Sequence, residues 1–308
     1  MRGKLKVILT GGAGFIGSHI VDKLMERGEE VLVIDDLSSG DSRNLPTGVE
    51  FYNLNIADRK ITNIVTKFSA DAIIHCAAQA SVLNSMKDPV FDAEVNILHG
   101  LKIFNSAIQS GIKSYIYLNT GGALYGEPEY LPCDEEHPIA PISPYGLSKW
   151  TLETYINLLA PKSVDFTSLR LANVYGPRQD PNGEAGVVAI FIQKMLNQED
   201  VTIFGDGEQT RDFVYVQDVA ESVTSVLDKR VRGYINIGSG LGISVNDIFH
   251  KLSAETGYRK KPIYTPDRPG DVRHIYLNVS KAKSDLDWIA RTSIGEGVKL
   301  TINALRKG

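Results

Sequence analysis

Hydrophobic and polar positions alternate along the chain in two recurring patterns. Short apolar runs rich in β-branched residues are separated by longer segments in which apolar residues recur every three or four positions. The short runs are typical of buried strands, and the longer segments are typical of helices that cover them. The alternation predicts right-handed βαβ units and a parallel, doubly wound α/β sheet. The predicted strands span 5–9, 31–34, 49–54, 71–75, 114–118 and 164–169, and the clearest helices span 89–109 and 144–159.

The pattern loosens after Asn173. Residues 175–183 are rich in turn formers, which indicates a change of domain. We therefore expect a first domain over 1–172 and a smaller, loop-rich α/β domain over 173–308, of the kind that covers a ligand. The segment at about 213–238 looks like another βα unit and is expected to return to the first domain.

A glycine-rich stretch, TGGAGFIG over Thr10–Gly17, joins the first predicted strand to the first predicted helix. In such a position Gly11 permits a tight turn, Gly14 lets the backbone approach a pyrophosphate, and Gly17 lets the helix pack close to the sheet. The N–H groups at the helix start then face the phosphates, and the helix dipole favours the negative charge. The pattern predicts a Rossmann-type dinucleotide site; the alternative is a glycine-rich turn without a ligand.

Asp35, at the end of the second predicted strand, strengthens this prediction. A carboxylate about 20 residues after such a loop is suited to hydrogen-bond the ribose hydroxyls of the adenosine. It would repel a 2′-phosphate, so the expected cofactor is NAD rather than NADP. The alternative is that Asp35 or Asp36 only caps a loop.

A second group of candidate residues is formed by Thr120, Tyr145 and Lys149. Tyr145 and Lys149 are four residues apart at the start of the helix predicted over 144–159, so they share a helix face. Thr120 lies just past the fifth predicted strand, and ligands of open α/β sheets bind beyond the carboxyl ends of the strands. The three side chains therefore predict a proton-transfer site. The alternative is a surface tyrosine beside a solvated lysine.

For Tyr145 to act as a base near neutral pH, its pKa must fall from about 10 to about 7, which requires about 4 kcal/mol. The charge of Lys149 at about 6 Å would supply roughly 3 kcal/mol at an effective dielectric constant near 20. The positive nicotinamide ring of NAD⁺ would add the remainder, so we expect the tyrosine to be most acidic with the oxidised cofactor bound. Thr120 would hydrogen-bond the reacting hydroxyl and hold it near the phenolate.

Composition excludes several other classes of function. The net charge of −4 provides no basic surface for nucleic acid, and no apolar stretch is long enough to cross a bilayer. Cys76 and Cys133 lack CxxC spacing, which argues against a disulfide framework and fits a reducing cytoplasm. The six histidines are scattered and form no metal-binding motif, so no metal site is expected.

These motifs together resemble the extended short-chain dehydrogenase/reductase family, and within it the UDP-glucose 4-epimerases. The likeness covers essentially the whole chain and is carried by TGGAGFIGSH, Asp35, Cys76-Ala77-Ala78, Asn96, Thr120, YGLSK over 145–149 and NVYGPRQ over 173–179. Related 4,6-dehydratases usually carry Asp-Glu after the catalytic threonine. This chain has Gly121-Gly122 there, which speaks against elimination chemistry.

The resemblance implies catalytic roles for Thr120, Tyr145 and Lys149. For NAD it implies contacts from Gly11, Gly14, Phe15, Ile16, Asp35, Asn55, Ile56, Cys76, Ala77, Ala78, Asn96, Tyr145 and Lys149. For a UDP-sugar it implies contacts from Thr120, Asn173, Val187, Phe204, Arg211, Arg268 and Asp271. The two arginines suit a diphosphate, which matches the guanidinium fork. For Arg211 the alternative is an ion pair with Asp212.

The reaction implied by the resemblance is an NAD-dependent 4-epimerisation of UDP-glucose or UDP-galactose through a 4-keto intermediate. The nearest alternative is a 4-epimerase for UDP-N-acetylglucosamine or a UDP-uronate, because Ile275 stands near the position that sizes the sugar pocket. A net dehydrogenase and a non-catalytic NAD sensor are further alternatives. The chain departs from the family at Asn119, where a serine usually precedes the threonine.

The resemblance also implies a homodimer. The helices predicted over 89–109 and 144–159 would pair with their copies in a four-helix interface. The alternative is that their apolar faces only pack the core of one chain.

Overall fold

Seven parallel strands form the central sheet. The computed structural model describes residues 3–181, 186–267 and 272–306. The strands of the sheet lie in the order β11-β6-β5-β4-β1-β2-β3, and every pairing is parallel. The expected doubly wound α/β sheet is therefore confirmed, with strand ends shifted by one or two residues. The bounds are β1 (Lys6–Thr10), β2 (Glu30–Asp35), β3 (Glu50–Asn53), β4 (Ala72–His75), β5 (Ser114–Thr120), β6 (Asp165–Leu171) and β11 (Gly233–Ile237).

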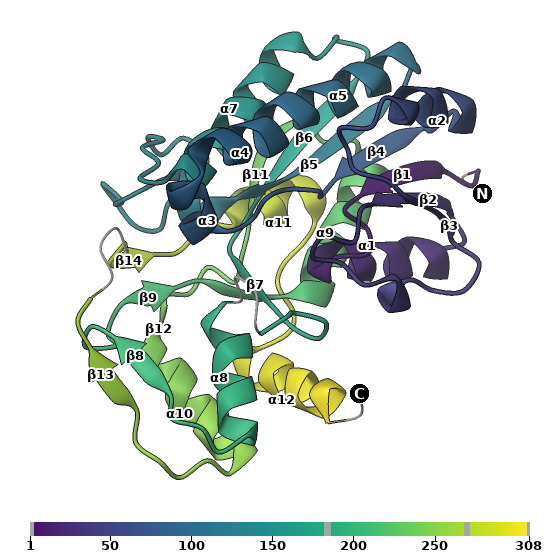
Figure 1. The fold of residues 1–308 in the computed structure, drawn as a ribbon. Coiled ribbons are helices and arrows are strands. Elements are labelled where there is room, and N and C mark those ends of the chain that lie inside the picture. The colour runs from purple at the N-terminus through teal and green to yellow at the C-terminus, as the bar shows by residue number, and fades with distance from the viewer. Residues whose placement is uncertain (1–2, 182–185, 268–271, 307–308) are drawn as a thin grey trace.

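Helices cover both faces of this sheet (Figure 1). Successive residues of a strand point to opposite faces, so Ile8 and Leu32 enter one apolar core while Val7 and Val33 enter the other. The first core is completed by α2 (Lys60–Phe68), α5 (Gly100–Gln109) and α7 (Pro144–Leu159). The second is completed by α1 (Phe15–Glu26), α9 (Val216–Lys229) and α11 (Ser280–Leu286).

The strand order reverses at the neighbouring pair β1 and β4. From β1 the chain winds outward through β2 and β3, and it then crosses to β4 and winds the other way through β5 and β6. Open α/β sheets bind their ligands beyond the carboxyl ends of the strands at such a switch point. The glycine-rich loop follows β1, and the loop containing Cys76 follows β4.

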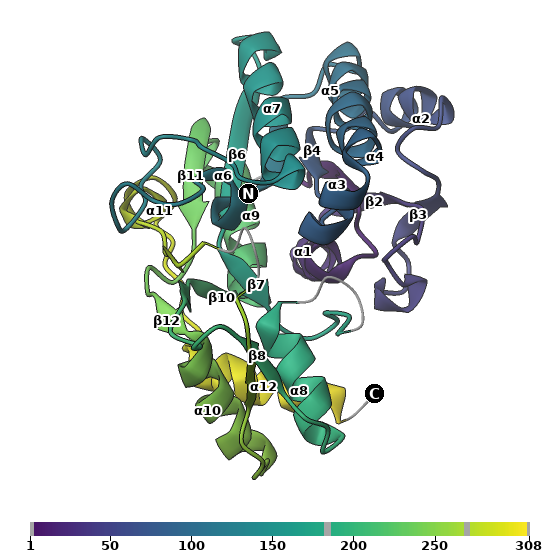
Figure 2. The ribbon, with the colours of Figure 1, turned by 60° about the vertical axis from the view of Figure 1, so that its left-hand side comes forward.

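The remaining elements form a smaller lobe next to the sheet, seen from a second side in Figure 2. Its helices α8 (Val187–Leu196), α10 (Val245–Thr256) and α12 (Ile294–Leu305) share a separate apolar core. Its strands form two parallel pairs, β7–β10 and β8–β13, and a mixed group in which β9 lies between β12 and β14. The bounds are β7 (Asn173–Tyr175), β8 (Thr202–Phe204), β9 (Thr210–Arg211), β10 (Phe213–Tyr215), β12 (Ile243–Ser244), β13 (Ile263–Thr265) and β14 (His274–Ile275).

Several parts of the chain beyond residue 172 lie on the sheet rather than in the small lobe. α9 packs against α1, and β11 pairs with β6. β10 belongs to the same predicted βα unit, but it pairs with β7 outside the seven-stranded sheet. α11 packs against α9 and β11, a contact that the sequence pattern did not predict.

The helix predicted over 89–109 contains a change of helix type. α4 (Pro89–Ala93) leads into a π-helical stretch over Glu94–His99, and α5 follows directly. Such stretches occur often at functional sites. The shorter helices are η1 (Ser42–Asn44), α3 (Val82–Lys87) and α6 (Gly121–Leu124). Among the described residues, no helix combines the length and apolar character needed to span a membrane.

Candidate functional site

The glycine-rich loop after β1 is in close contact with its surroundings. Gly11 has a φ of +72°, and a Cβ placed on it would stand 2.6 Å from a backbone nitrogen of the loop after β4. A Cβ on Gly17 would stand 2.1 Å from the carbonyl oxygen of Gly11. Gly14 is the N-cap of α1, so no capping side chain competes for the first N–H groups of the helix, which begins at Phe15 and Ile16. Such a bare helix start is suited to bind an anion.

Asp35 ends β2 beside this loop and is 8% exposed. Its carboxylate accepts hydrogen bonds from the backbone N–H groups of Ala13 and Leu37, both at 2.9 Å. Burial raises the pKa of Asp35, and these two hydrogen bonds act against the rise. The structure therefore places the carboxylate against the glycine-rich loop, as a dinucleotide site requires.

Asn55 and Ile56 follow β3, the edge strand next to β2. The side-chain amide of Asn55 donates to the carboxylate of Asp36 at 2.6 Å, which ties this loop to the end of β2. Ile56 is buried in the core under α2. The structure thus brings the two residues to the carboxyl ends of the strands, where Asp35 also lies.

Cys76, Ala77 and Ala78 form the loop after β4. The N–H of Cys76 donates to the carbonyl of Thr10 at 3.1 Å, so this loop runs beside the glycine-rich loop. Burial raises the pKa of the Cys76 thiol to about 12. The thiol is therefore neutral at pH 7 and contributes bulk rather than charge.

Asn96, on the π-helical stretch, is 2% exposed and binds protein groups with both ends of its amide. It accepts from the N–H of Gln79 and donates to the carbonyl of Gln79, both at 2.9 Å. It also donates to Asp92 at 3.0 Å and to Ser148 on α7 at 3.2 Å. The amide therefore ties the loop after β4 to α7.

Thr120, Tyr145 and Lys149 come together at the carboxyl end of β5. Thr120 ends β5 and caps α6, and its side chain is close enough to the phenol of Tyr145 to lower the pKa of that phenol. Tyr145 lies in the first turn of α7, whose N-cap is Ser143. One turn later, Nζ of Lys149 donates to the carbonyl of Leu118 at 2.7 Å. The sheet edge thus holds a phenol, a hydroxyl and an ammonium group in one cluster.

Burial controls the electrostatics of this cluster. Lys149 is 3% exposed, and its burial lowers its pKa to about 8. Burial also raises the pKa of Tyr145, the charge of Asp92 adds to the rise, and the side chain of Thr120 opposes it. The expectation for the NAD⁺-bound protein counted the charges of Lys149 and the nicotinamide ring, whereas burial acts in the opposite direction. In the protein without cofactor the phenol is protonated at neutral pH.

Asn173 lies beside this cluster. A Cβ placed on Gly122 would stand 3.2 Å from Oδ1 of Asn173 and 3.9 Å from Oγ1 of Thr120. Val187 begins α8 and Phe204 ends β8, and both side chains are half-buried.

Arg211 lies on β9 and donates from Nη1 to the carbonyl of Thr210 at 2.9 Å. The alternative considered for it was an ion pair with Asp212. The carboxylate of Asp212 instead accepts from the N–H groups of Ser239 and Gly240, at 2.7 and 3.1 Å, and binds the turn after β11.

Ile275 pairs with Arg211 in the register of β14 and β9, and it is 3% exposed. Arg268 and Asp271, the other two expected substrate residues, lie outside the described residues. Among the side chains that are described, no group of three or more His, Cys, Asp or Glu could hold a metal ion.

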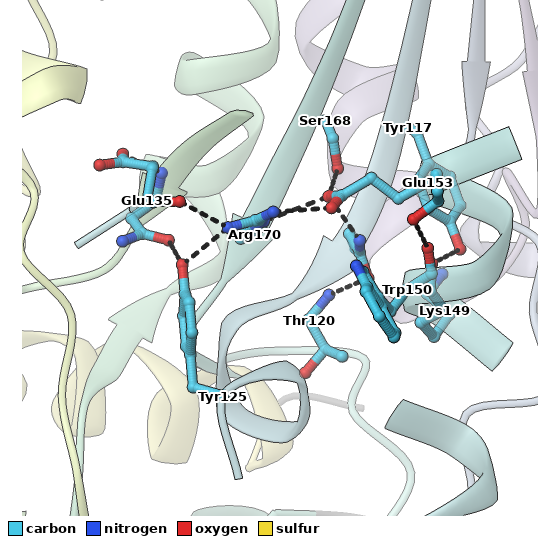
Figure 3. A network of polar contacts seen from close by, with 12 residues as sticks. Tyr117, Thr120, Tyr125, Glu135, Lys149, Trp150, Glu153, Ser168 and Arg170 are labelled. Atoms are coloured by element: carbon cyan, nitrogen blue, oxygen red, sulfur yellow. Dashed lines mark hydrogen bonds and ion pairs between the residues drawn. The ribbon is translucent and has the colours of Figure 1, made fainter. Parts of the chain in front are cut away.

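Sequence reasoning missed a buried polar network behind the cluster. It joins Asn119 on β5, Glu153 on α7 and Arg170 on β6. Figure 3 shows the side chains of Glu153 and Arg170. One signal was available, because Glu153 follows Lys149 by four residues and so lies on the same face of the helix. The contacts with Asn119 and Arg170 join distant parts of the sequence, so no local pattern indicates them.

Comparisons with known proteins agree with this geometry. The family described as the NAD dependent epimerase/dehydratase family matches residues 7–238. A putative UDP-glucose 4-epimerase of Methanocaldococcus jannaschii is 44% identical over 97% of this chain and 98% of its own length. The crystal structure of UDP-glucose 4-epimerase with UDP-glucose from Thermotoga maritima has a TM-score of 0.95 and 46% identity, and the match covers 98% of this chain and 99% of that one. The Thermus thermophilus UDP-glucose 4-epimerase complex with NAD has a TM-score of 0.92 and 40% identity over the same shares of the chains.

Proposed function

The chain belongs to the NAD-dependent epimerase/dehydratase family, and from this premise we propose that it interconverts UDP-glucose and UDP-galactose by inverting C4 of the hexose. The observation that carries the proposal is the convergence of Thr120, at the end of β5, with Tyr145 in the first turn of α7, where Thr120 lowers the pKa of the phenol and Lys149 lies one helical turn away. This cluster lies at the carboxyl end of β5, on the sheet edge that also carries the glycine-rich loop.

NAD is the cofactor that the residues of this chain fit. The backbone around Gly11 and Gly17 leaves no room for side chains, and the start of α1 offers uncapped N–H groups to a pyrophosphate. The carboxylate of Asp35 suits ribose hydroxyls and repels a 2′-phosphate. When bound, NAD supplies reversible hydride transfer with C4 of the sugar.

Within this proposal Tyr145 is the acid–base group. Its phenolate removes the proton of the 4-hydroxyl, and its phenol returns a proton when the 4-keto sugar is reduced. Thr120 hydrogen-bonds the same hydroxyl and holds it at the phenol. Since the pKa of Lys149 is about 8, this ammonium is mostly charged at pH 7 and favours the phenolate.

Inversion requires the 4-keto sugar to turn while its nucleotide stays bound. We assign this anchor to Arg211 on the diphosphate and to apolar contacts of Val187 and Phe204, with Asn173 next to the sugar. Arg268 and Asp271 complete the anchor in this proposal. A firmly held nucleotide and a loosely held hexose let both faces of C4 reach the same reacting groups.

The residues after Thr120 oppose an elimination reaction. A dehydratase needs an additional acid and base beside the sugar, whereas this chain has Gly121 and Gly122. A Cβ on Gly121 would stand 2.7 Å from Cδ1 of Leu277 and 3.1 Å from the backbone oxygen of Arg170, so a side chain at this position would require Leu277 to shift.

The sugar preference depends on the walls of the pocket. Ile275 is intermediate in size between the small residues that admit N-acetyl groups and the tyrosine that blocks them. A UDP-N-acetylglucosamine or UDP-uronate 4-epimerase is therefore the second candidate.

We further propose that the protein is a cytoplasmic homodimer. Large apolar side chains are exposed on helices that pack side by side, α3 and α4 against α7. They include Leu83, Met86, Val90, Phe91 and Leu158, and we call them the helical apolar patch. The two cysteines are unpaired, which supports a reducing compartment.

Incubation of the purified protein with NAD and a panel of UDP-sugars tests the proposed reaction. UDP-glucose and UDP-galactose should interconvert, and free NADH should not accumulate at 340 nm. Conversion of UDP-N-acetylglucosamine or UDP-glucuronate at a higher kcat/KM would favour the second candidate. Stoichiometric NADH release would indicate a net dehydrogenase, and no conversion of any sugar would contradict the proposal.

A further inference from the structure

The network behind the active-site cluster is centred on a buried ion pair. Nη2 of Arg170 donates to Oε1 of Glu153 at 2.7 Å, and Nε of Arg170 donates to Oε2 at 3.2 Å. Figure 3 shows the two side chains directed toward one another from β6 and α7. Glu153 is 1% exposed and Arg170 is 2% exposed. A buried pair of this kind recovers its desolvation cost only if its remaining hydrogen-bonding groups also find partners.

The other hydrogen-bond partners of Glu153 come from β5 and β6, two adjacent strands of the sheet. The hydroxyl of Ser168 on β6 donates to Oε2 at 2.6 Å, and Nδ2 of Asn119 on β5 donates to the same oxygen at 2.8 Å. Burial alone would lower the pKa of Arg170, but the hydrogen bonds and charge of Glu153 outweigh burial and raise it. Arg170 is therefore charged at any pH at which the protein functions.

Asn119 connects this ion pair to a reacting residue. Its Oδ1 accepts the backbone N–H of Thr120 at 2.8 Å, while its Nδ2 donates to Glu153. The orientation of the amide is unambiguous, because the N–H of Thr120 requires an acceptor and the carboxylate of Glu153 requires a donor. The rigid amide thus transmits the position of Glu153 to the backbone of Thr120.

A second connection runs parallel to the first. Nζ of Lys149 donates to the carbonyl of Leu118, and Glu153, one turn further along α7, binds Asn119. Two consecutive residues of β5 are therefore tied to two consecutive turns of α7. These ties set the separation of Thr120, at the strand end, from Tyr145, on the same helix.

We propose that Asn119 and Glu153 are positioning residues for the reaction: through hydrogen bonds they hold the strand end that carries Thr120 against the helix that carries Tyr145. The expected loss of kcat rests on the proposed function. The link between β5 and α7 rests on the hydrogen bonds alone. Neither side chain touches the reacting atoms, so loss of the link should lower kcat and leave KM nearly unchanged. A displacement of about 1 Å at a reacting group can reduce the rate about 100-fold.

The first variant is Asn119→Asp, which keeps the acceptor for Thr120 but sets a second carboxylate against Glu153. We expect kcat for UDP-galactose to fall about 10- to 100-fold, with KM within about threefold of the unmodified protein. The double variant Asn119→Asp/Glu153→Gln reverses the link. The new amide nitrogen takes the place of Oε2 and donates to the new carboxylate, and the new amide oxygen still accepts from Nη2 of Arg170. The contact of Oε2 with Nε of Arg170 is lost, so kcat should recover in part relative to Asn119→Asp.

Tyr125→Phe is the matched control. The hydroxyl of Tyr125 accepts from Nη1 of Arg170 at 3.2 Å and donates to Oδ1 of Asn236 at 2.8 Å, so it belongs to the same network on the side away from Thr120. This variant should lower the melting temperature by a few degrees, with kcat unchanged. An equal loss of kcat in Tyr125→Phe would assign the effect to general stability and overturn the proposal.

Two further outcomes overturn it: an unaltered kcat in Asn119→Asp, or a loss that the double variant does not recover. Hydrogen–deuterium exchange at the Thr120 amide gives a test that is independent of turnover. In Asn119→Ala this amide should exchange at least tenfold faster, since its acceptor is lost. If the unmodified protein converts no UDP-sugar, the proposed function fails and the exchange result alone decides whether the link exists. Unchanged exchange refutes the link in either case.

Discussion

At the scale of single residues, Lys149 and Tyr145 combine a functional requirement with an energetic cost. In the proposed mechanism Tyr145 reacts as a phenolate and Lys149 as an ammonium group, and burial opposes both charges. The arrangement therefore stores a cost in the folded protein that NAD and substrate can offset when they bind. One substitution at each residue tests these two effects: the acid–base role of Tyr145 and the energetic cost of burying the charge of Lys149.

Tyr145→Phe removes only the phenol oxygen. Turnover should fall at least about 1,000-fold, because the acid–base group is lost while the packing of the ring is kept. NAD affinity should change only a few-fold, as measured by equilibrium titration of fluorescence. Tyr130→Phe, at an exposed tyrosine, is the control and should leave turnover unchanged. Turnover in Tyr145→Phe at the level of this control would contradict the mechanism.

Lys149→Met should abolish turnover and stabilise the cofactor-free protein at pH 7. The folded-state pKa of about 8 lies below the ordinary 10.5, so the cost of burying the charge is fully present below pH 8 and disappears as pH rises toward 10.5. The difference corresponds to at most about 3 kcal/mol. Loss of the hydrogen bond to Leu118 reduces it, so we expect a gain of about 1–2 kcal/mol.

Chemical denaturation of both proteins at pH 7 and pH 9.5 checks this sign. The advantage of Lys149→Met should shrink at the higher pH. A lower stability of the variant at pH 7 would show that the lysine is not held at an energetic cost.

At the scale of elements, the backbone around the start of α1 leaves no room for a side chain at Gly17. A Cβ on Gly17 would meet backbone atoms, the carbonyl oxygen of Gly11 and the Cα of Gly12, at 2.1 and 2.9 Å. Backbone atoms cannot rotate out of the way as a side chain can, so the loop itself would have to move. The same loop faces the strand-order switch, where NAD is expected to bind.

Gly17→Ala should therefore lower NAD affinity at least tenfold and reduce the free energy of unfolding by about 1–3 kcal/mol. Isothermal titration calorimetry and urea denaturation measure the two effects. Gly295→Ala in α12 is the matched control, because nothing lies within 4 Å of its added Cβ. It should leave NAD affinity unchanged and add up to about 1 kcal/mol of stability. Equal NAD affinities in the two variants would show that the close backbone contact at Gly17 is not needed to bind NAD.

At the scale of the whole molecule, the sheet and the small lobe contribute different parts of the proposed site. The sheet edge supplies the cofactor loop and the proton-transfer cluster, and the small lobe supplies Arg211, Val187 and Phe204. The chain passes from one part to the other and returns, since β11 and α11 pack on the sheet after residues of the small lobe. Substrate and cofactor residues are thus held on one connected framework.

The helical apolar patch belongs to the same scale. Val90 is 75% exposed and Leu158 is 78% exposed, and association with a second copy would remove both side chains from water. Val90→Asp should convert the proposed dimer to a monomer, because a carboxylate would be buried without a partner. Light scattering after size-exclusion chromatography measures the mass.

Ile263→Asp, at an apolar residue on β13 that is 48% exposed, is the control and should leave the mass unchanged. A monomeric mass for the unmodified protein would contradict the proposed dimer.

Local sequence determined the sheet and the glycine-rich loop, and it was sufficient to propose Thr120, Tyr145 and Lys149 as the proton-transfer residues. Strand and helix periodicity, the backbone freedom of Gly11 and the four-residue spacing of Tyr145 and Lys149 are all set over a few consecutive residues. A linear pattern can therefore reveal them. The position of Asp35 at the end of β2 was predictable for the same reason, because the pattern showed the strand that ends in it.

Tertiary structure alone decided the features that join distant segments. The strand β10 was expected to join the main sheet as part of a βα unit. It does not, because it pairs with β7, which lies outside that sheet. Asn119, Glu153 and Arg170 meet only after β5, α7 and β6 have packed, and the amide of Asn96 binds partners on two other segments. Burial of Tyr145 and Lys149 likewise depends on everything packed around them. Hydrogen bonding and desolvation depend on which segments meet in space. The spacing of residues in the sequence therefore could not predict these partners or this burial.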